Sequence, residues 1–165
     1  MIGGFETGPH GVATHRILMV EDNPADRRLA CEMFCEAGVG LELYTVTNGA
    51  EALDFLHQAG RFSAAPMPDL VLLDLNLPGI NGIEVLSRIR ASEELKSLPV
   101  IVLSSSRNEK EMARSRELHA DAVWRKPFEI SDYIRMACEI ERFCAECSAA
   151  RRDTRPALVT ARKSA

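Results

Sequence analysis

Short apolar runs alternate with amphipathic stretches of helical period along most of this chain, and this alternation constrains its fold more than any other feature. Strands separated by helices in this way form a parallel sheet with helices on both faces. The predicted strands are β-branched or leucine-rich, and they span Arg16–Val20, Leu41–Val46, Asp69–Asp74, Pro99–Ser104 and Asp121–Trp124. The first, third and fourth runs are almost continuously apolar, which favours central positions, whereas the second alternates and suits an edge.

Helix signals lie between these strands. Asn23 followed by Pro24 is typical of an N-cap and a first helical residue, and Gly38 marks the end of that helix. Asn-Gly pairs open the next two helices at positions 48 and 81. Two more helices are predicted, over about 108–118 and 129–147. The pattern therefore predicts five strand–helix pairs in one α/β domain.

The length of 165 residues suits one domain with short tails. We expect a flexible N-terminal arm over 1–14, the folded domain over 15–147, and a basic, flexible C-terminal tail over 148–165. No low-complexity linker marks a second domain.

Several classes of function are disfavoured by charge and composition. A net charge of -4 offers no basic field for direct binding of nucleic acid. No apolar run reaches the roughly 18 residues that span a membrane, and no secretory signal precedes the first strand, so we expect a cytoplasmic protein. Five cysteines, an odd number, argue against a disulfide framework. The Cys144–Cys147 pair lies in a helical pattern without further metal ligands, so a zinc or redox role is disfavoured.

Chemically active side chains follow the predicted strands at their carboxyl ends. In an open parallel sheet these ends meet at one edge, where such folds place their sites. The residues expected there are Glu21, Asp22, Asp74, Ser104 and Lys126. Three converging carboxylates repel one another unless a cation joins them. Hard oxygen ligands on loops favour Mg²⁺.

Four segments in this order carry a resemblance to a known family: ILMVEDN from position 17, LVLLDLNLPGING from 70, LPVIVLSSS from 98 and WRKPF from 124. From about Arg16 to Phe143 the chain resembles the receiver domains of two-component response regulators. The stretch 60–69 and the phrase LDLNLP are most similar to free-standing regulators paired with bacterial phytochrome-type histidine kinases. The resemblance implies a flavodoxin-like three-layer sandwich with a five-stranded parallel sheet in the order 2-1-3-4-5 and five helices.

The resemblance also implies roles for individual residues. Asp74 would accept a phosphoryl group from a histidine kinase or a phosphotransfer protein, while Ser104 and Lys126 would bind the phosphoryl oxygens. The implied ligands of Mg²⁺ are Glu21, Asp22, Asp74 and the backbone carbonyl of Asn76. Such a protein catalyses only its own phosphorylation and dephosphorylation and is not otherwise an enzyme.

The resemblance extends to the surroundings of the acceptor. Pro127 is expected to follow a cis peptide bond that aims Lys126 inward. The side chain of Asn76 is expected to hold or exclude the water that hydrolyses the acyl phosphate, with Ser105 and Ser106 on the same rim.

One departure and two alternatives remain. The family usually carries an aromatic switch residue three positions before the lysine, where this chain has Val123, with Trp124 next to it on the opposite face. A phosphatase-like hydrolase with an Asp nucleophile is the first alternative, but it usually needs a second Asp at the position of Asn76. The second alternative is a pseudo-receiver adaptor that binds partners without phosphotransfer.

Two apolar stripes in the predicted fifth helix suggest an interface. The stripe expected to face the sheet comprises Ile130, Ile134, Ala137 and Cys138, and the second stripe comprises Tyr133, Met136, Ile140, Phe143 and Cys147. The second stripe predicts a homodimer, or a docked partner, through the fourth helix, fifth strand and fifth helix. The alternative is a wide stripe packed on the first helix.

Overall fold

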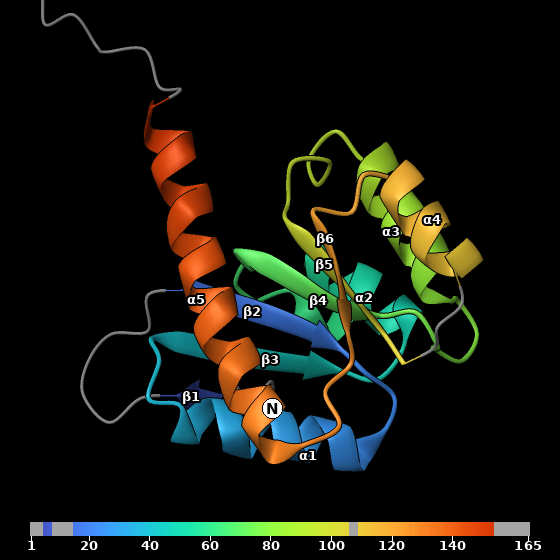
Figure 1. Ribbon diagram of the computed structural model, residues 1–165. Coiled ribbons are helices and arrows are strands. Elements are labelled where there is room, and N and C mark those ends of the chain that lie inside the picture. The colour runs from blue at the N-terminus through green and yellow to red at the C-terminus, as the bar shows by residue number, and fades with distance from the viewer. Residues whose placement is uncertain (1–4, 8–14, 106–108, 154–165) are drawn as a thin grey trace, which may run out of the picture.

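One mixed sheet lies between two layers of helices (Figure 1). The computed structural model describes residues 5–7, 15–105 and 109–153. The strands are β1 (Phe5–Thr7), β2 (His15–Val20), β3 (Leu41–Val46), β4 (Leu70–Asp74), β5 (Val100–Ser104) and β6 (Ala122–Arg125). The helices are α1 (Pro24–Glu36), α2 (Gly49–Leu56), α3 (Gly82–Ala91), α4 (Glu109–Glu117) and α5 (Ile130–Asp153), with a short 3₁₀ helix, η1 (Gly60–Phe62). Among the described helices, none combines the length and the apolar character that crossing a bilayer requires.

The five strands predicted from the sequence form the parallel part of the sheet. Their order is β3-β2-β4-β5-β6, so the expected order 2-1-3-4-5 is confirmed. Strand β1 was not predicted. It pairs antiparallel with β3, with Phe5 opposite Leu43, and so β3 is an edge of the parallel part only. A strand of three residues shows no periodicity, but it satisfies backbone groups on an edge that would otherwise lack partners.

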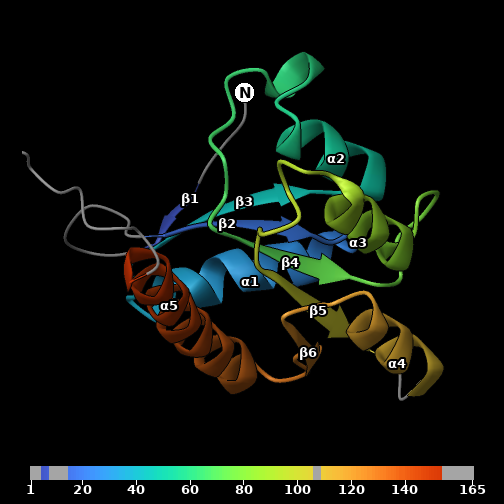
Figure 2. The same cartoon turned by 90° about the horizontal axis from the view of Figure 1, so that it is seen from above.

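The central strands β4 and β5 bury both of their faces, because helices cover each side of the sheet (Figure 2). Helices α1 and α5 lie on one face, and α2, α3 and α4 lie on the other. Successive side chains of a strand point to opposite faces, so Ile17 joins the core under α1 and α5 while Leu18 joins the other core. Burying one such side chain fully contributes about 1.5–3 kcal/mol.

Side-chain caps begin three of the helices as predicted. The side-chain oxygen of Asn23 accepts from the N–H of Ala25, and Asn48 and Asn81 each accept from the residue three positions on, all at 2.9 Å. Each cap typically stabilises a helix by about 1 kcal/mol. These caps fix where the chain turns from the sheet edge into the helices.

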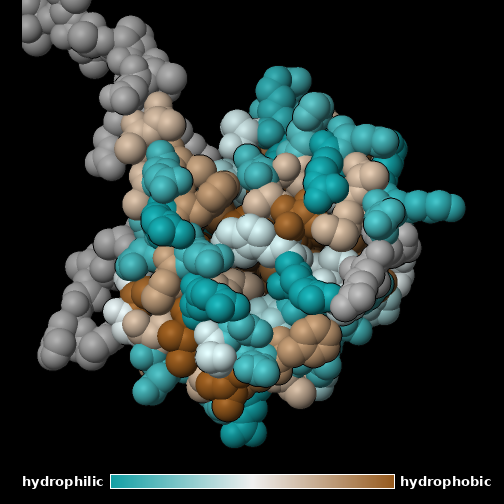
Figure 3. All heavy atoms as spheres, in the orientation of Figure 1, coloured by the Kyte–Doolittle hydropathy of each residue, from teal (hydrophilic) through white to brown (hydrophobic). Residues whose placement is uncertain are grey.

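The assignment of the two stripes on α5 was wrong for most of its residues, although Ala137 is buried in the core as predicted. Tyr133, Met136 and Ile140 are buried against the sheet, whereas Ile130 is 57% exposed and Cys138 is exposed. The contacts between α5 and α1 account for the difference, because two helices on one sheet face bury a wide stripe together. The face of the molecule that carries α5 mixes hydrophilic and hydrophobic residues (Figure 3). The predicted homodimer therefore loses the observation on which it rested.

The ends of the domain differ in two details from the expected limits. Strand β1 lies within the segment 1–14, which was expected to be a flexible arm. Helix α5 continues to Asp153, beyond the predicted end near Cys147, through a segment rich in Ala and Arg, which favour helix. The predicted domain limits otherwise remain predictions.

Candidate functional site

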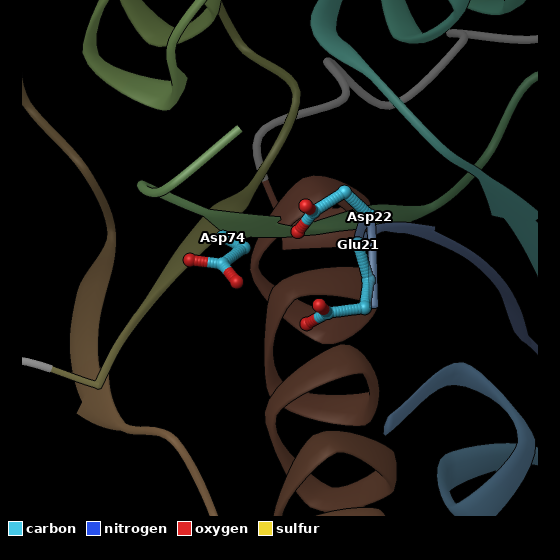
Figure 4. A group of neighbouring side chains, drawn as sticks. All are labelled: Glu21, Asp22 and Asp74. Atoms are coloured by element: carbon cyan, nitrogen blue, oxygen red, sulfur yellow. The ribbon is translucent and has the colours of Figure 1, made fainter. Parts of the chain in front are cut away.

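Three carboxylates meet at the carboxyl edge of the parallel strands (Figure 4). One ligand oxygen from each of Glu21, Asp22 and Asp74 lies within 4.8 Å of the others. Glu21 is fully buried and Asp74 is 3% exposed, whereas Asp22 is exposed. Buried carboxylates this close together are costly without a neutralising cation.

The ends of β2 and β4 place these acids. The N–H of Glu21 continues the β2–β3 ladder by donating to Val46 O at 3.1 Å, and Asp74 is the last residue of β4. After β4 the chain turns back, and the N–H of Asn76 donates to Asp74 Oδ1 at 2.9 Å. This hydrogen bond orients the Asp74 carboxylate.

A close approach of helix α3 supports that turn. The N–H of Gly82 donates to Leu75 O, and a Cβ at Gly82 would lie 2.3 Å from Asp74 O. Only glycine fits at this position without displacing the backbone of Asp74.

Lys126 supplies the cation that partly neutralises the acids. Its Nζ lies 2.6 Å from Glu21 Oε2, 2.8 Å from Asp26 Oδ2 and 2.9 Å from Asp74 Oδ2. The backbone N–H of Lys126 donates to Ser104 O at 3.0 Å, which aligns the end of β6 with that of β5. Burial by itself would lower the pKa of Lys126, but the ion pairs with Asp26, Glu21 and Asp74 raise the pKa above its ordinary value.

Glu21 is suited to bind a divalent cation. Burial raises the pKa of its carboxyl, and Lys126 and the N–H of Asn23 only partly oppose this effect. Oε1 accepts from that N–H at 3.0 Å, whereas Oε2 lies close to Lys126 Nζ without the alignment of a hydrogen bond. A buried carboxylate oxygen without an aligned donor, next to Asp22 and Asp74, fits a divalent metal site.

Two residues of the site were not predicted. Asp26 forms the ion pair with Lys126, and the guanidinium of Arg27 donates to Glu21 O at 2.8 Å and Asp22 O at 2.7 Å. From the sequence, an acid in the first turn of a helix indicates only a favourable interaction with the helix dipole. No sequence signal showed that these side chains point toward the acidic loop.

The predicted hydroxyl lies at the same edge. Ser104 is 3% exposed at the end of β5, and its neighbour Leu103 is opposite Asp74 in the β4–β5 register. The side-chain amide of Asn76 donates to Ser105 Oγ at 3.0 Å, so these two rim residues are in contact. Ser106 lies outside the described residues. That the carbonyl of Asn76 is a ligand stays a prediction.

The expected cis bond before Pro127 is wrong. No described peptide bond is cis. Lys126 reaches its three carboxylates from a trans bond, the isomer that X–Pro favours by about 0.5–1 kcal/mol. Val123 and Trp124 pack on opposite faces of the sheet, as predicted.

Comparison with known proteins identifies the class that this fold and site define. The response regulator receiver domain family matches residues 17–137, and the chain belongs to this family. Response regulator Rcp1 of Synechocystis sp. is 41% identical over 130 residues, which cover 79% of this chain and 88% of Rcp1.

Two solved structures share the fold at similar identity. That of the phosphorylated cyanobacterial phytochrome response regulator RcpA is 41% identical with a TM-score of 0.73, covering 79% of this chain and 94% of RcpA. The Mn²⁺-bound form of Rcp1 is 40% identical with a TM-score of 0.70, covering 78% of this chain and 93% of Rcp1.

Proposed function

We propose that this protein accepts a phosphoryl group on Asp74 from a phosphohistidine of a histidine kinase or a phosphotransfer protein. The observation that carries the proposal is the position of the Asp74 carboxylate, 2.9 Å from Lys126 Nζ and within 4.8 Å of ligand oxygens of Glu21 and Asp22. A carboxylate between a cation and a candidate metal site suits the acceptance of a charged group.

The transfer exchanges one bond for another. An Asp74 oxygen forms a bond to phosphorus as the N–P bond of the phosphohistidine breaks, and the electron pair of that bond stays on the imidazole nitrogen. Lys126 stabilises the charge on a phosphoryl oxygen, and the Ser104 hydroxyl donates to another. Water later cleaves the acyl phosphate, which returns the carboxylate and releases inorganic phosphate.

Mg²⁺ is the proposed cofactor, with Glu21, Asp22, Asp74 and the carbonyl of Asn76 as ligands. When bound, the ion neutralises negative charge on the acids and on the group that is transferred. The acidic cluster and the buried Oε2 of Glu21 support this assignment.

The donor and the location are parts of the same proposal. The similarity to a regulator described as a phytochrome response regulator favours a phytochrome-type histidine kinase as the donor of the phosphoryl group.

The signal is proposed to leave through protein contacts, since Phe128 and Ile130, which follow Lys126 closely in the sequence, are 73% and 57% exposed. A cytoplasmic location is also proposed, because five cysteines, an odd number, do not fit a disulfide framework.

Labelling with phosphodonors tests the proposal. The wild type is incubated with Mg²⁺ and either acetyl phosphate or a labelled phytochrome-type kinase, and the label is assayed for acid stability and base lability. We expect stoichiometric label on the wild type, none on Asp74→Asn, and none in excess chelator. Asp69→Asn is the matched control. Asp69 precedes β4, and its carboxylate accepts a hydrogen bond from the N–H of Arg16 and not from Lys126. Label retained by Asp74→Asn would contradict the assignment of the acceptor.

A further inference from the structure

Asp26 lies outside the four sequence segments that carry the resemblance and outside the acidic cluster, yet it contacts the site. Its Oδ2 is 2.8 Å from Lys126 Nζ, and its side chain is 28% exposed. We infer that Asp26 is a positioning residue, which holds the Lys126 ammonium beside Asp74 when a divalent ion occupies the acidic cluster. The inference rests on the proposed function, because Lys126 matters there through its contact with the phosphoryl group.

The geometry of the ammonium separates Asp26 from the other two acids. A lysine Nζ has three N–H donors, and three carboxylate oxygens surround this one at 2.6–2.9 Å. Glu21 and Asp74 belong to the group that fits a divalent cation, but Asp26 does not. An ion bound to Glu21 and Asp74 draws electron density from the carboxylates that also contact the ammonium, and the two cations repel, so these two contacts of Lys126 weaken. Asp26 is therefore the partner that Lys126 keeps in both states.

The first turn of α1 fixes Asp26 relative to the acidic loop. Asn23 caps the helix through the N–H of Ala25, and Arg27 donates to the carbonyl oxygens of Glu21 and Asp22. These bonds tie the start of α1 to the residues that follow β2. Asp26 thus approaches Lys126 from a turn that these hydrogen bonds join to the acidic loop.

Removing the carboxylate of Asp26 has a specific consequence. The ammonium is left with Glu21 and Asp74 alone, so it competes directly with a divalent ion for their oxygens. Asp26→Asn is therefore expected to weaken binding of Mg²⁺, and this effect requires Lys126. An acid that only stabilises the helix dipole would act equally with or without Lys126.

Calorimetric titration with Mg²⁺, without phosphodonor, tests this coupling. We expect Asp26→Asn to raise the Kd for Mg²⁺ roughly tenfold, as is common for residues that support ligands. In a Lys126→Gln background the same substitution is expected to change the Kd by less than about twofold. Glu32→Gln is the matched control, because it removes the same charge from an exposed position on α1, where Glu32 pairs with Arg28. Asp26→Glu, which keeps the charge, is expected to recover most of the affinity.

Labelling by acetyl phosphate at saturating Mg²⁺ supplies a second readout. We expect Asp26→Asn to be labelled roughly tenfold more slowly than the wild type, with Asp26→Glu faster than Asp26→Asn. An equal effect of Asp26→Asn on the Kd in both Lys126 backgrounds, or no effect in either, would overturn the inference. A wild type that binds Mg²⁺ but takes no label would instead defeat the proposed function, and the titrations would still decide the coupling.

Discussion

The side-chain amide of Asn76 donates a hydrogen bond to Ser105 Oγ at 3.0 Å. Asn76 lies in the loop after β4, two positions after the proposed acceptor Asp74, and Ser105 is the residue that follows β5. The contact therefore joins the ends of two neighbouring strands. The amide is therefore held by a rim hydroxyl, which limits how it can orient a water near Asp74.

Ser105→Ala is expected to shorten the lifetime of the acyl phosphate. The substitution removes the acceptor of the Asn76 amide, which becomes able to direct water toward the phosphoryl group. Loss of one hydrogen bond of about 1 kcal/mol corresponds to a change of roughly fivefold. The measurement is loss of label after removal of the phosphodonor. In an Asn76→Ala background, Ser105→Ala should no longer change the lifetime of the acyl phosphate. A longer lifetime in Ser105→Ala alone would contradict the role given to the contact.

Glu21→Gln is expected to stabilise the metal-free protein at neutral pH. Burial raises the pKa of Glu21, so the folded state holds this proton more tightly than the unfolded state does. Its stabilising contribution is present below the unfolded pKa and is lost as the pH rises through the folded pKa. Glu21→Gln should therefore raise the free energy of unfolding by on the order of 1 kcal/mol at pH 7, and this increase should become smaller as the pH falls toward about 4.

Urea unfolding in chelator at both pH values measures this difference. Glu93→Gln, on a side chain that is 86% exposed, is the control and should change stability by less than about 0.5 kcal/mol. A gain that is independent of pH would contradict the explanation.

Mg²⁺ is expected to stabilise the folded wild type. An ion that binds only the folded state at about 100 times its Kd adds about 2.7 kcal/mol. Asp22→Ala should lose most of this increment, while its metal-free stability should change little because Asp22 is exposed. Thermal unfolding with Mg²⁺ or chelator measures both effects, and an undiminished Mg²⁺ shift in Asp22→Ala would remove Asp22 from the ligand set.

Gly82→Ala is expected to disturb the acceptor. The added Cβ would lie 2.3 Å from Asp74 O and 2.7 Å from Leu75 Cα, so the loop after β4 must move. Overpacking of this kind typically costs about 1–3 kcal/mol. Gly49→Ala is the comparison variant, because its Cβ would lie 2.4 Å from Ile80 O, which is in the same loop but does not contact Asp74 O directly. Both variants should lose stability in urea, but only Gly82→Ala should also lose most of its rate of labelling.

The local sequence pattern was sufficient to predict the parallel strands of the core and the residues at their carboxyl edge. Continuous apolar runs such as 70–73 are required of strands buried on both faces, and Asn caps such as Asn23 act within three residues of chain. Because parallel strands end at one edge, the sequence alone predicts that Glu21, Asp22 and Asp74 meet.

Only the tertiary structure determined which face of a helix is buried and which distant segments of the chain are in contact. Both stripes of α5 have helical period, and only the packing of α5 on α1 and the sheet determined that Tyr133 is buried and Ile130 exposed. The antiparallel strand β1 depends on the edge of β3, which lies far along the chain. Asp26 has the sequence signature of any acid in a first helical turn. Its contact with Lys126, one hundred residues away, exists because α1 begins and β6 ends beside the same edge of the sheet.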